Sequence, residues 1–386
     1  MPSPIEASGL EDVVAASTRL SDVDGDAGRL VIAGLPVEDL AGNVTFEEVV
    51  HLLWHGRLPN DDELASVRAK LGAARAAARF HAVDLPDPMD ALRARAAQLP
   101  SNDDRSFDEM LRVLGGVAVA AASSSATRPD PELSHAADYL RLVTGCTPSA
   151  EATAALDAYL VTVVDHGMNA STFTARVVAS TESDTVSAVV AAIGALKGRL
   201  HGGAPGPVLD MLDAIGDATA AREWLTAALA RGERIMGMGH RIYRVRDPRA
   251  FVLERALSRL ETERRNADAK AKPLRGPDPA HAAEPDAEAK PLRGRLHLAR
   301  AVEREAEALL AAKSPARALR ANVEFYTAVL LEAVGLPRAM FTPTFAVSRA
   351  AGWCAHVEEQ RRCGKLVRPR SRYVGELLTA RSDRSP

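Results

Sequence analysis

The sequence predicts a mainly α-helical protein, and two observations carry this prediction. Apolar residues recur at helical spacing along most of the 386 residues, with Pro and Asp/Asn breaks between the helical stretches. Only one short stretch shows the alternating pattern and turn residues of paired strands. We therefore expect an all-α fold with a single short β-hairpin near the amino terminus.

Composition limits the class of protein. The chain is 47% hydrophobic and 26% charged with a formal net charge of -3, which is ordinary for a globular protein. Its length suits two domains, or one large domain with a smaller companion. The near-neutral charge gives no reason to expect nucleic acid or an acidic membrane surface as a partner.

Localisation signals point to the cytoplasm. No run approaches the roughly 18 apolar residues of a membrane span, and residues 1–12 lack the basic start and apolar core of a signal peptide. The cysteines (Cys146, Cys354 and Cys363) are odd in number and have no metal-ligand spacing. They favour a reducing compartment and give no reason to expect a metal site.

The hairpin is expected at residues 17–33, where alternating runs flank the turn formers Asp24-Gly25 and Gly28. A helix should then begin at Thr45, because Glu48 three residues later completes a capping box. We expect Pro59 to end that segment.

The remaining helices follow from apolar spacing and breaks. Asn322 should cap a helix near the carboxyl end. The other expected helices are 61–80, 88–99, 107–127, 133–145, 152–165, 185–196, 208–231, 249–264, 296–312 and 345–360.

Residues 265–295 differ in composition from the rest. Residues 268–276 are nearly repeated at 286–294, and the segment is polar, contains Pro and Gly, and has few large apolar residues. Such a composition predicts a mobile surface insertion. A basic binding patch is the functional alternative.

The stretch 235–249 combines several chemical features. Gly237 and Gly239 allow positive φ and close approach of a ligand, and His240 directly after them can donate or accept a proton near neutrality. Four arginines follow within ten residues, and guanidinium groups suit carboxylates and phosphates. The arginines are Arg241, Arg244, Arg246 and Arg249. An anion site with an acid/base histidine is the functional reading, and a solvated basic loop is the alternative.

Other helix ends share this character. His166 and His201 each stand beside glycine where a predicted helix stops, and Glu324 stands in a predicted first turn. Taken singly, each has an ordinary structural role, because a histidine at a helix end is usually a cap and a first-turn glutamate is favoured by the helix dipole. Arg349 and Arg368 follow later in the chain.

Together these strings resemble the citrate synthase family. The matching segments are Leu-Lys-Gly-Arg-Leu-His-Gly-Gly-Ala (196–204), Met-Gly-Met-Gly-His-Arg-Ile-Tyr (236–243) with Asp-Pro-Arg (247–249), Asn-Val-Glu-Phe-Tyr-Thr-Ala-Val-Leu-Leu (322–331), Phe-Ala-Val-Ser-Arg-Ala-Ala-Gly-Trp (345–353), Arg-Pro-Arg (368–370) and Ser-Thr-Arg-Leu-Ser-Asp-Val-Asp-Gly (17–25). The likeness covers nearly the whole chain except 265–295.

The resemblance implies an all-α, two-domain fold. The large domain would comprise residues 1–205 and 335–386, and the small domain residues 206–334. The site would lie between them, so that closure excludes water. A homodimer is also implied, with Arg368 completing the site of the partner subunit. No NADH control is expected, because the short amino terminus lacks the extra module of the hexameric type.

The family condenses acetyl-CoA with oxaloacetate and hydrolyses the citryl thioester, so the resemblance implies an acyl-CoA:oxaloacetate C-acyltransferase. Acetyl-CoA would be a co-substrate, and no cofactor is bound permanently. Glu324 would be the base, His201 the donor to the thioester oxygen, and His240 the group that polarises the ketone. The implied dicarboxylate ligands are His166, Arg249, Arg349 and the partner's Arg368. The implied CoA contacts are Gly237, Gly239, and Arg244 or Arg246.

The sequence departs from the family at two places. The family's usual base is aspartate, whereas Glu324 is one methylene longer, which adds roughly 1.5 Å of reach. We expect the partial positive charge of the helix start to keep this carboxylate ionised. The second departure is Pro205-Gly206, where Asn-Glu is usual.

Other activities stay open at this point. A 2-methylcitrate synthase that uses propionyl-CoA fits the same motifs, because the sequence does not settle the acyl pocket. Glu324 and Pro205 also allow a catalytically weak paralogue kept for binding or regulation. An enzyme that cleaves citryl-CoA is the remaining alternative.

Overall fold

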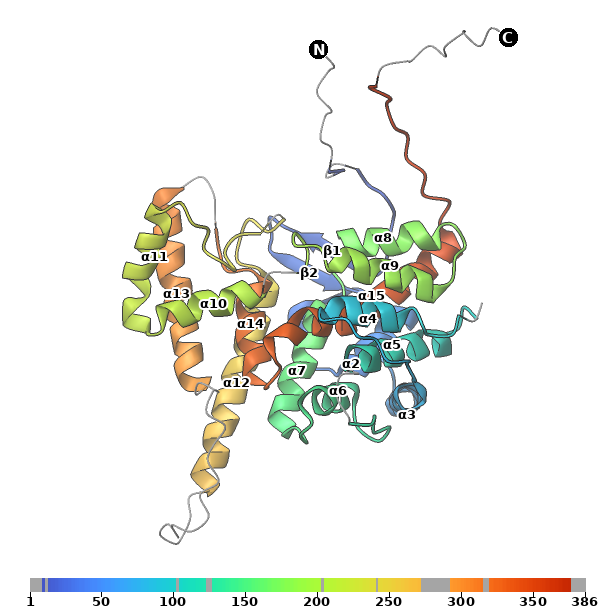
Figure 1. The fold of residues 1–386 in the computed structure, drawn as a ribbon, viewed down its shortest axis with the longest axis horizontal. Helices are drawn as coiled ribbons and strands as arrows, with labels where there is room; N and C mark the ends of the chain where they lie inside the picture. The colour runs from blue at the N-terminus through green and yellow to red at the C-terminus, as the bar shows by residue number, and fades with distance from the viewer. Residues whose placement is uncertain are drawn as a thin grey trace, which may run out of the picture.

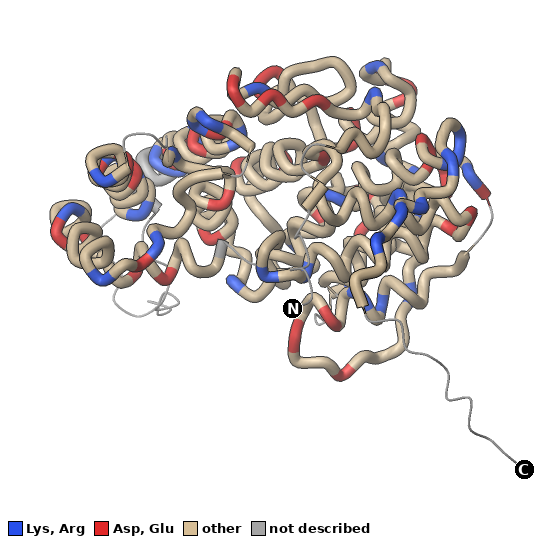
Figure 2. Tube along the Cα trace, turned by 90° about the horizontal axis from the view of Figure 1, so that it is seen from above, with Lys and Arg blue, Asp and Glu red and all other residues tan. Residues whose placement is uncertain are grey.

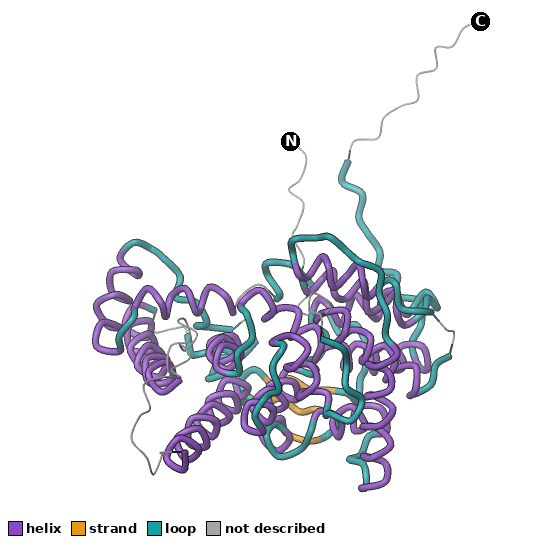
Figure 3. Tube along the Cα trace, turned by 60° about the horizontal axis from the view of Figure 1, so that its bottom comes forward, coloured by secondary structure: helices purple, strands orange, loops and turns teal. Residues whose placement is uncertain are grey.

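The computed structural model describes residues 9–10, 13–101, 104–122, 127–202, 205–240, 242–271, 292–314 and 319–375. Helices make up most of this part of the chain, and the few strands form one small sheet (Figure 3). The predicted all-α class is therefore confirmed. Figure 1 shows helices α10 to α14 gathered at one side of the molecule and the other helices packed together at the opposite side.

The sheet is a three-stranded antiparallel meander in the order β1-β2-β3. Strands β1 (Ser21–Asp24) and β2 (Arg29–Ile32) form the predicted hairpin, with Ser21 opposite Ile32 and Asp24 opposite Arg29. Strand β3 (Leu35–Pro36) was not predicted. Ala33 and Gly34 both have positive φ, which makes the tight turn that adds this short strand.

The first group of helices includes α2, which has the predicted capping box. The Thr45 side chain accepts from Glu48 N, and Glu48 accepts from Thr45 N. The helix ends at His55, because Gly56 adopts the left-handed conformation. The prediction that Pro59 ends it is therefore wrong by three residues. The group comprises α1 (Val37–Leu40), α2 (Phe46–His55), α3 (Asp61–Ala77), α4 (Pro88–Ala96), α5 (Phe107–Ala122), α6 (His135–Thr144), α7 (Ala150–Val163), α8 (Ala170–Ala179), α9 (Thr185–Leu196) and α15 (Phe341–Cys363).

Three of these helices differ from the sequence prediction, and one of them is the four-residue helix α1, which was not predicted. Helix α8 was missed, although Asn169 caps its start by accepting from Thr172 N. Helix α15 begins at Phe341, four residues before the predicted start, after the short 3-10 turn η2 (Arg338–Met340).

The second group contains α10 (Pro205–Ile215), η1 (Ala218–Ala220), α11 (Ala221–Ala230), α12 (Pro248–Ala271), α13 (Leu292–Lys313) and α14 (Val323–Ala333). The prediction of one helix over 208–231 is wrong. Gly216 has φ +72 and ends α10, after which Asp217 caps the turn that leads into α11.

The predicted insertion at 265–295 is only partly described. Its first residues extend α12 to Ala271, and its last residues belong to α13 from Leu292. The predicted end of the first helix at residue 264 and the predicted start of the second at residue 296 are therefore wrong, because both helices extend into the segment. The remainder, residues 272–291, lies outside the described part of the chain.

The core is apolar and spans both groups. Figure 2 shows Lys and Arg interspersed with Asp and Glu along the chain rather than gathered in one large patch of either sign. Among the described helices, none combines the length and the apolar character that crossing a bilayer requires. The long helix α15 lies at the centre of the first group, where Trp353 is fully buried.

Candidate active site

Six of the residues singled out from the sequence converge on one region. Each lies at a helix end or on α15: His166 after α7, His201 after α9, His240 before α12, Arg249 in the first turn of α12, Glu324 in the first turn of α14, and Arg349 within α15. Their charges act on one another. For example, Arg249 and Arg349 both depress the pKa of His166, and Arg349 depresses that of His201.

His240 is oriented by its own backbone. Its Nδ1 accepts from the amides of Ile242 and Tyr243 at 3.1 and 3.2 Å. A neutral imidazole that accepts at Nδ1 carries its proton on Nε2. Desolvation, aided by Arg249, lowers the pKa of His240 to about 4, so the ring is neutral at physiological pH and offers an Nε2–H donor.

Arg249 stands beside that donor and is fixed by Asp247. The guanidinium Nε and Nη2 donate to the two carboxylate oxygens at 3.0 and 2.8 Å, and both side chains are buried. Nη2 also lies 3.3 Å from His240 Nε2. Because both of these groups are donors, they converge on a position suited to an acceptor such as a carboxylate or ketone oxygen.

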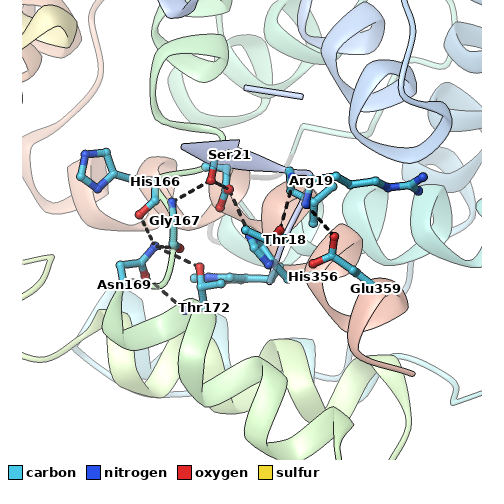
Figure 4. A network of polar contacts seen from close by, with 12 residues as sticks. Thr18, Arg19, Ser21, His166, Gly167, Asn169, Thr172, His356 and Glu359 are labelled. Carbon is cyan, nitrogen blue, oxygen red and sulfur yellow. Dashed lines mark hydrogen bonds and ion pairs between the residues drawn. The ribbon is translucent and has the colours of Figure 1, made fainter. Parts of the chain in front are cut away.

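His166 joins the same group through Tyr243. Its Nε2 lies 3.2 Å from the Tyr243 hydroxyl, and its ring centroid is 5.7 Å from that of His240. Burial, with Arg249 and Arg349 nearby, keeps the pKa of His166 well below its usual value. The ring follows the turn 165–167, which Figure 4 shows beside Ser21.

Arg349 is buried without a carboxylate at ion-pair distance among the described residues. Its Nε donates to the carbonyl of Val163 at 2.7 Å, and the guanidinium lies 4.7 Å from the Phe345 ring centroid. Desolvation lowers its pKa to about 10, so the group stays charged at neutral pH. A buried cation with an incomplete set of acceptors is a natural anion ligand.

The carboxyl group of Glu324 has a shifted pKa. Desolvation raises its pKa to about 7, opposed by Arg249 and assisted by Asp247. The expectation that the helix start keeps it ionised is therefore wrong near neutrality, because desolvation outweighs the favourable end of α14. A carboxylate whose pKa lies near neutrality is well matched to general base catalysis.

His201 is held by Ser171 on α8. Its Nε2 lies 2.8 Å from Ser171 Oγ, which accepts from Trp353 Nε1 at 3.1 Å and donates to Asn169 Oδ1 at 2.8 Å. Desolvation, with Arg349 nearby, lowers the pKa of His201 to about 4. When the hydroxyl turns its single proton from Asn169 Oδ1 to His201 Nε2, the neutral ring presents an Nδ1–H donor.

Gly237 and Gly239 have a structural role of their own. Both have positive φ, and an added Cβ would lie 2.8 Å from Phe325 Cδ2 or Leu319 Cδ2 respectively. Gly239 N donates to Arg320 O at 2.7 Å, and Asn322 N donates to Gly237 O at 2.9 Å. The two glycines thus join the His240 loop to the start of the Glu324 helix.

The structure does not bring the other three arginines into this region. Arg246 pairs with Glu254 and Glu303, while the side chain of Arg244 is exposed. Arg368 is exposed on the extended segment after α15, which leaves the body of the molecule (Figure 1).

Three residues of the site were missed from the sequence. Asp247 was quoted only as part of the Asp-Pro-Arg string (247–249) and was given no role, although its spacing of two from Arg249 allows a local ion pair. Tyr243 lies in a quoted motif but was given no role. Ser171 had no sequence signal, because it meets His201 only through the packing of α8 near α9.

Comparison with known proteins agrees with this geometry. The family model described as citrate synthase, C-terminal domain, matches residues 9–370. The chain is 37% identical to a citrate synthase of Haloferax volcanii, over 95% of both chains. It is 36% identical to a 2-methylcitrate synthase of Mycobacterium tuberculosis, over 95% of this chain and 90% of that one.

A solved structure shows the same fold. The citrate synthase of Thermoplasma acidophilum, determined as a ternary complex with carboxymethyl coenzyme A and oxaloacetate, superposes with a TM-score of 0.78. The sequences are 26% identical, and the match covers 97% of this chain and 98% of that one.

Proposed function

We propose that this chain, which belongs to the citrate synthase family, condenses acetyl-CoA with oxaloacetate and hydrolyses the product thioester to citrate and CoA. The observation that carries the proposal is the pairing of a neutral His240, held with Nε2–H outward, with a carboxyl at Glu324 whose pKa is about 7. The reaction needs both a base and a donor to a developing oxyanion.

In the proposed first step, the ionised Glu324 removes a proton from the methyl group of acetyl-CoA. His201 donates from Nδ1 to the thioester oxygen as enolate charge develops, while Ser171 fixes the ring at Nε2, 2.8 Å away. The enolate carbon then attacks the ketone of oxaloacetate. His240 donates from Nε2 to the ketone oxygen as it becomes an alkoxide, and water afterwards hydrolyses the citryl thioester.

Oxaloacetate would be held by His166, Arg249 and Arg349. Arg249 is pre-aligned by Asp247, and Arg349 is buried with few acceptors, which suits a dianionic ligand. We also propose a cytoplasmic homodimer in which the exposed Arg368 reaches the partner's site. The proposed domains are 1–205 with 335–386, and 206–334, so that closure would bring His240 and Glu324 onto the bound substrate.

The CoA contacts are proposed from the loop 236–246. The backbone at Gly237 and Gly239 would lie along the ligand, and Arg244 is the better candidate for its phosphates. Arg246 already has two glutamate partners, so a phosphate would have to compete with them.

A 2-methylcitrate synthase is the second candidate, favoured by the 36% identity to that enzyme of Mycobacterium tuberculosis. The deciding experiment measures thiol release from acetyl-CoA and from propionyl-CoA, with and without oxaloacetate. A larger kcat/KM for propionyl-CoA would assign the second activity. Thiol release without oxaloacetate, or none with either thioester, would overturn the proposed condensation and favour a weak paralogue.

His240→Ala tests the mechanism directly. Loss of one oxyanion donor lowers the rate by about 10²–10³, so kcat should fall by that factor while binding of CoA changes little. A variant within threefold of the wild type would remove His240 from the mechanism.

A further inference from the structure

The β1–β2 hairpin contacts both histidine loops of the candidate site. Its first strand lies against the turn that carries His166, and its turn lies against the loop that follows His240. The Ser21 hydroxyl accepts from Gly167 N at 2.8 Å and contacts the buried Asp165 carboxylate. Figure 4 shows Ser21 between the Gly167 turn and His356.

Strand β1 meets the His166 turn with one face. Ser21 and Val23 are two residues apart and so point to the same side of the strand. A Cβ added to Gly167 would lie 3.3 Å from Val23 Cγ2, which places Val23 directly over the turn. The Asp165 oxygen that Ser21 contacts, Oδ2, also lies 3.0 Å from Nε2 of the buried His356, so β1 rests on a rigid support.

The hairpin turn meets the other loop through its backbone. Gly25 O accepts from Arg244 N at 2.9 Å. A Cβ on Gly25 would overlap the carbonyl oxygen of Ile242, and one on Gly28 would overlap Val245. Gly25 is thus required by close approach of the loop as well as by the turn.

That loop fixes His240. The amides of Ile242 and Tyr243 both donate to His240 Nδ1, so a shift of Ile242 alters the orientation and tautomer of the ring. Tyr243 then returns to His166 through its hydroxyl at 3.2 Å. The hairpin thus contacts the His240 loop and the His166 turn, and these two segments also contact each other through Tyr243.

We propose that the β1–β2 hairpin is a positioning element that sets the His166 turn and the His240 loop relative to each other. This proposal deepens the proposed function and rests on it. Gly25 acts on His240, which would meet the ketone, and Ser21 acts on the His166 turn, which would bind the dicarboxylate. Their substitutions therefore have different kinetic signatures.

The first test is Gly25→Ala, with Asp26→Ala as the control. Asp26 is the next residue of the same turn and is exposed. Gly25→Ala should lower kcat about 10- to 100-fold, because misplacement by about 1 Å costs about that much. Asp26→Ala should stay within twofold. Equal kcat values for Gly25→Ala and wild type would overturn the proposal.

The second test is Ser21→Ala, with Asp22→Ala as the control on the opposite face of β1. Ser21→Ala should raise KM for oxaloacetate at least fivefold with a smaller change in kcat, and Ser21→Thr, which keeps the hydroxyl, should restore it. A kcat defect without a change in KM, or no rescue by threonine, would show a merely structural role.

An activity-independent readout separates the two proposals. The ¹⁵N shifts of the His240 ring, assigned with His240→Ala, report its tautomer in the unliganded protein. Gly25→Ala should lose the Nε2–H form that the wild type shows. If the wild type makes no citrate or methylcitrate, the proposed function fails while this measurement still tests the hairpin. An unchanged tautomer in Gly25→Ala would overturn the positioning role. If the Gly25→Ala variant does not fold, the kinetics of Ser21→Ala decide whether the hairpin has this role.

Discussion

Asp247 binds Arg249 through both carboxylate oxygens, at 3.0 Å to Nε and 2.8 Å to Nη2. Asp247 Oδ2, the oxygen that accepts from Arg249 Nη2, also accepts from the amide of Val323 at 3.1 Å. This one side chain therefore connects the first turn of α12 with the first turn of α14, beside Glu324. It aligns a proposed substrate ligand and also acts electrostatically on the proposed base.

Asp247→Asn should separate these two effects. Weaker alignment of Arg249 should lower kcat/KM for oxaloacetate at least about tenfold, because an imperfect buried hydrogen bond costs about 1–3 kcal/mol. The Asp247 charge raises the pKa of Glu324, so its removal should move the acidic limb of the rate profile to lower pH. The control is Asp210→Asn, which removes the charge of an exposed carboxylate that pairs with Arg338. It should change neither kcat/KM for oxaloacetate nor the position of the acidic limb.

The pH dependence of the wild type should reflect Glu324. A base is active when ionised, and its pKa is raised to about 7. We therefore expect kcat/KM for acetyl-CoA to fall as pH drops through about 7, rather than near the ordinary glutamate value of about 4.3. Steady-state rates between pH 5.5 and 9 measure this limb, and a kcat/KM that stays constant down to pH 5.5 would contradict the assignment.

Glu324→Asp tests whether the rate depends on how far the carboxylate at position 324 extends toward the substrate. The shorter side chain withdraws the carboxylate by roughly 1.5 Å, so we expect the rate to fall about a hundredfold. A rate above that of the wild type would mean that the glutamate is a tolerated departure from the family geometry. A Glu324→Gln variant as active as the wild type would show that position 324 is not the base.

Glu324→Gln should also stabilise the protein at alkaline pH. The folded pKa of about 7 lies above the reference 4.5, so the folded protein holds this proton more tightly and Glu324 costs stability as pH rises between these values. At about 1.4 kcal/mol for each pH unit between 4.5 and about 7, the cost above pH 7 is at most about 3.5 kcal/mol. Urea unfolding at pH 5 and pH 8 should show a gain for the variant mainly at pH 8, and an equal effect at both would contradict this.

Ser171→Ala should impair His201 without unfolding the protein. The hydroxyl lies 2.8 Å from His201 Nε2 and accepts from Trp353 Nε1 at 3.1 Å. Its loss leaves the tautomer of His201 unset, so kcat should fall about tenfold with little change in KM for oxaloacetate. Thr174→Ala is the control, because Thr174 is half-buried on the same helix and its hydroxyl donates to Ala170 O within that helix.

The sequence predicted those features that local chemistry decides. The Thr45–Glu48 capping box and the Asn322 cap were readable because each needs only a few neighbouring residues. The break at Gly216 was missed because a glycine within an apolar pattern does not reveal its φ. Helix packing was out of reach, so the contact between Ser171 and His201 could not be predicted.

In the candidate site, too, the sequence predicted what local motifs decide and missed what depends on packing. Motif strings indicated His240 and Glu324, yet the helix dipole gave the wrong expectation for the charge of Glu324, because desolvation depends on the packed structure. Gly25 was read as a turn former. Its closest neighbour is the carbonyl of Ile242, which lies more than two hundred residues away along the chain.

Buried Arg349 has a consequence for how long the folded protein persists. A dicarboxylate that meets this guanidinium binds the native state and not the unfolded chain, so it stabilises the protein by about 2.7 kcal/mol at a hundredfold excess over Kd. The supply of the metabolite then governs resistance to proteolysis, since proteases act on transiently opened molecules. When the dicarboxylate is scarce, the enzyme itself should be degraded faster.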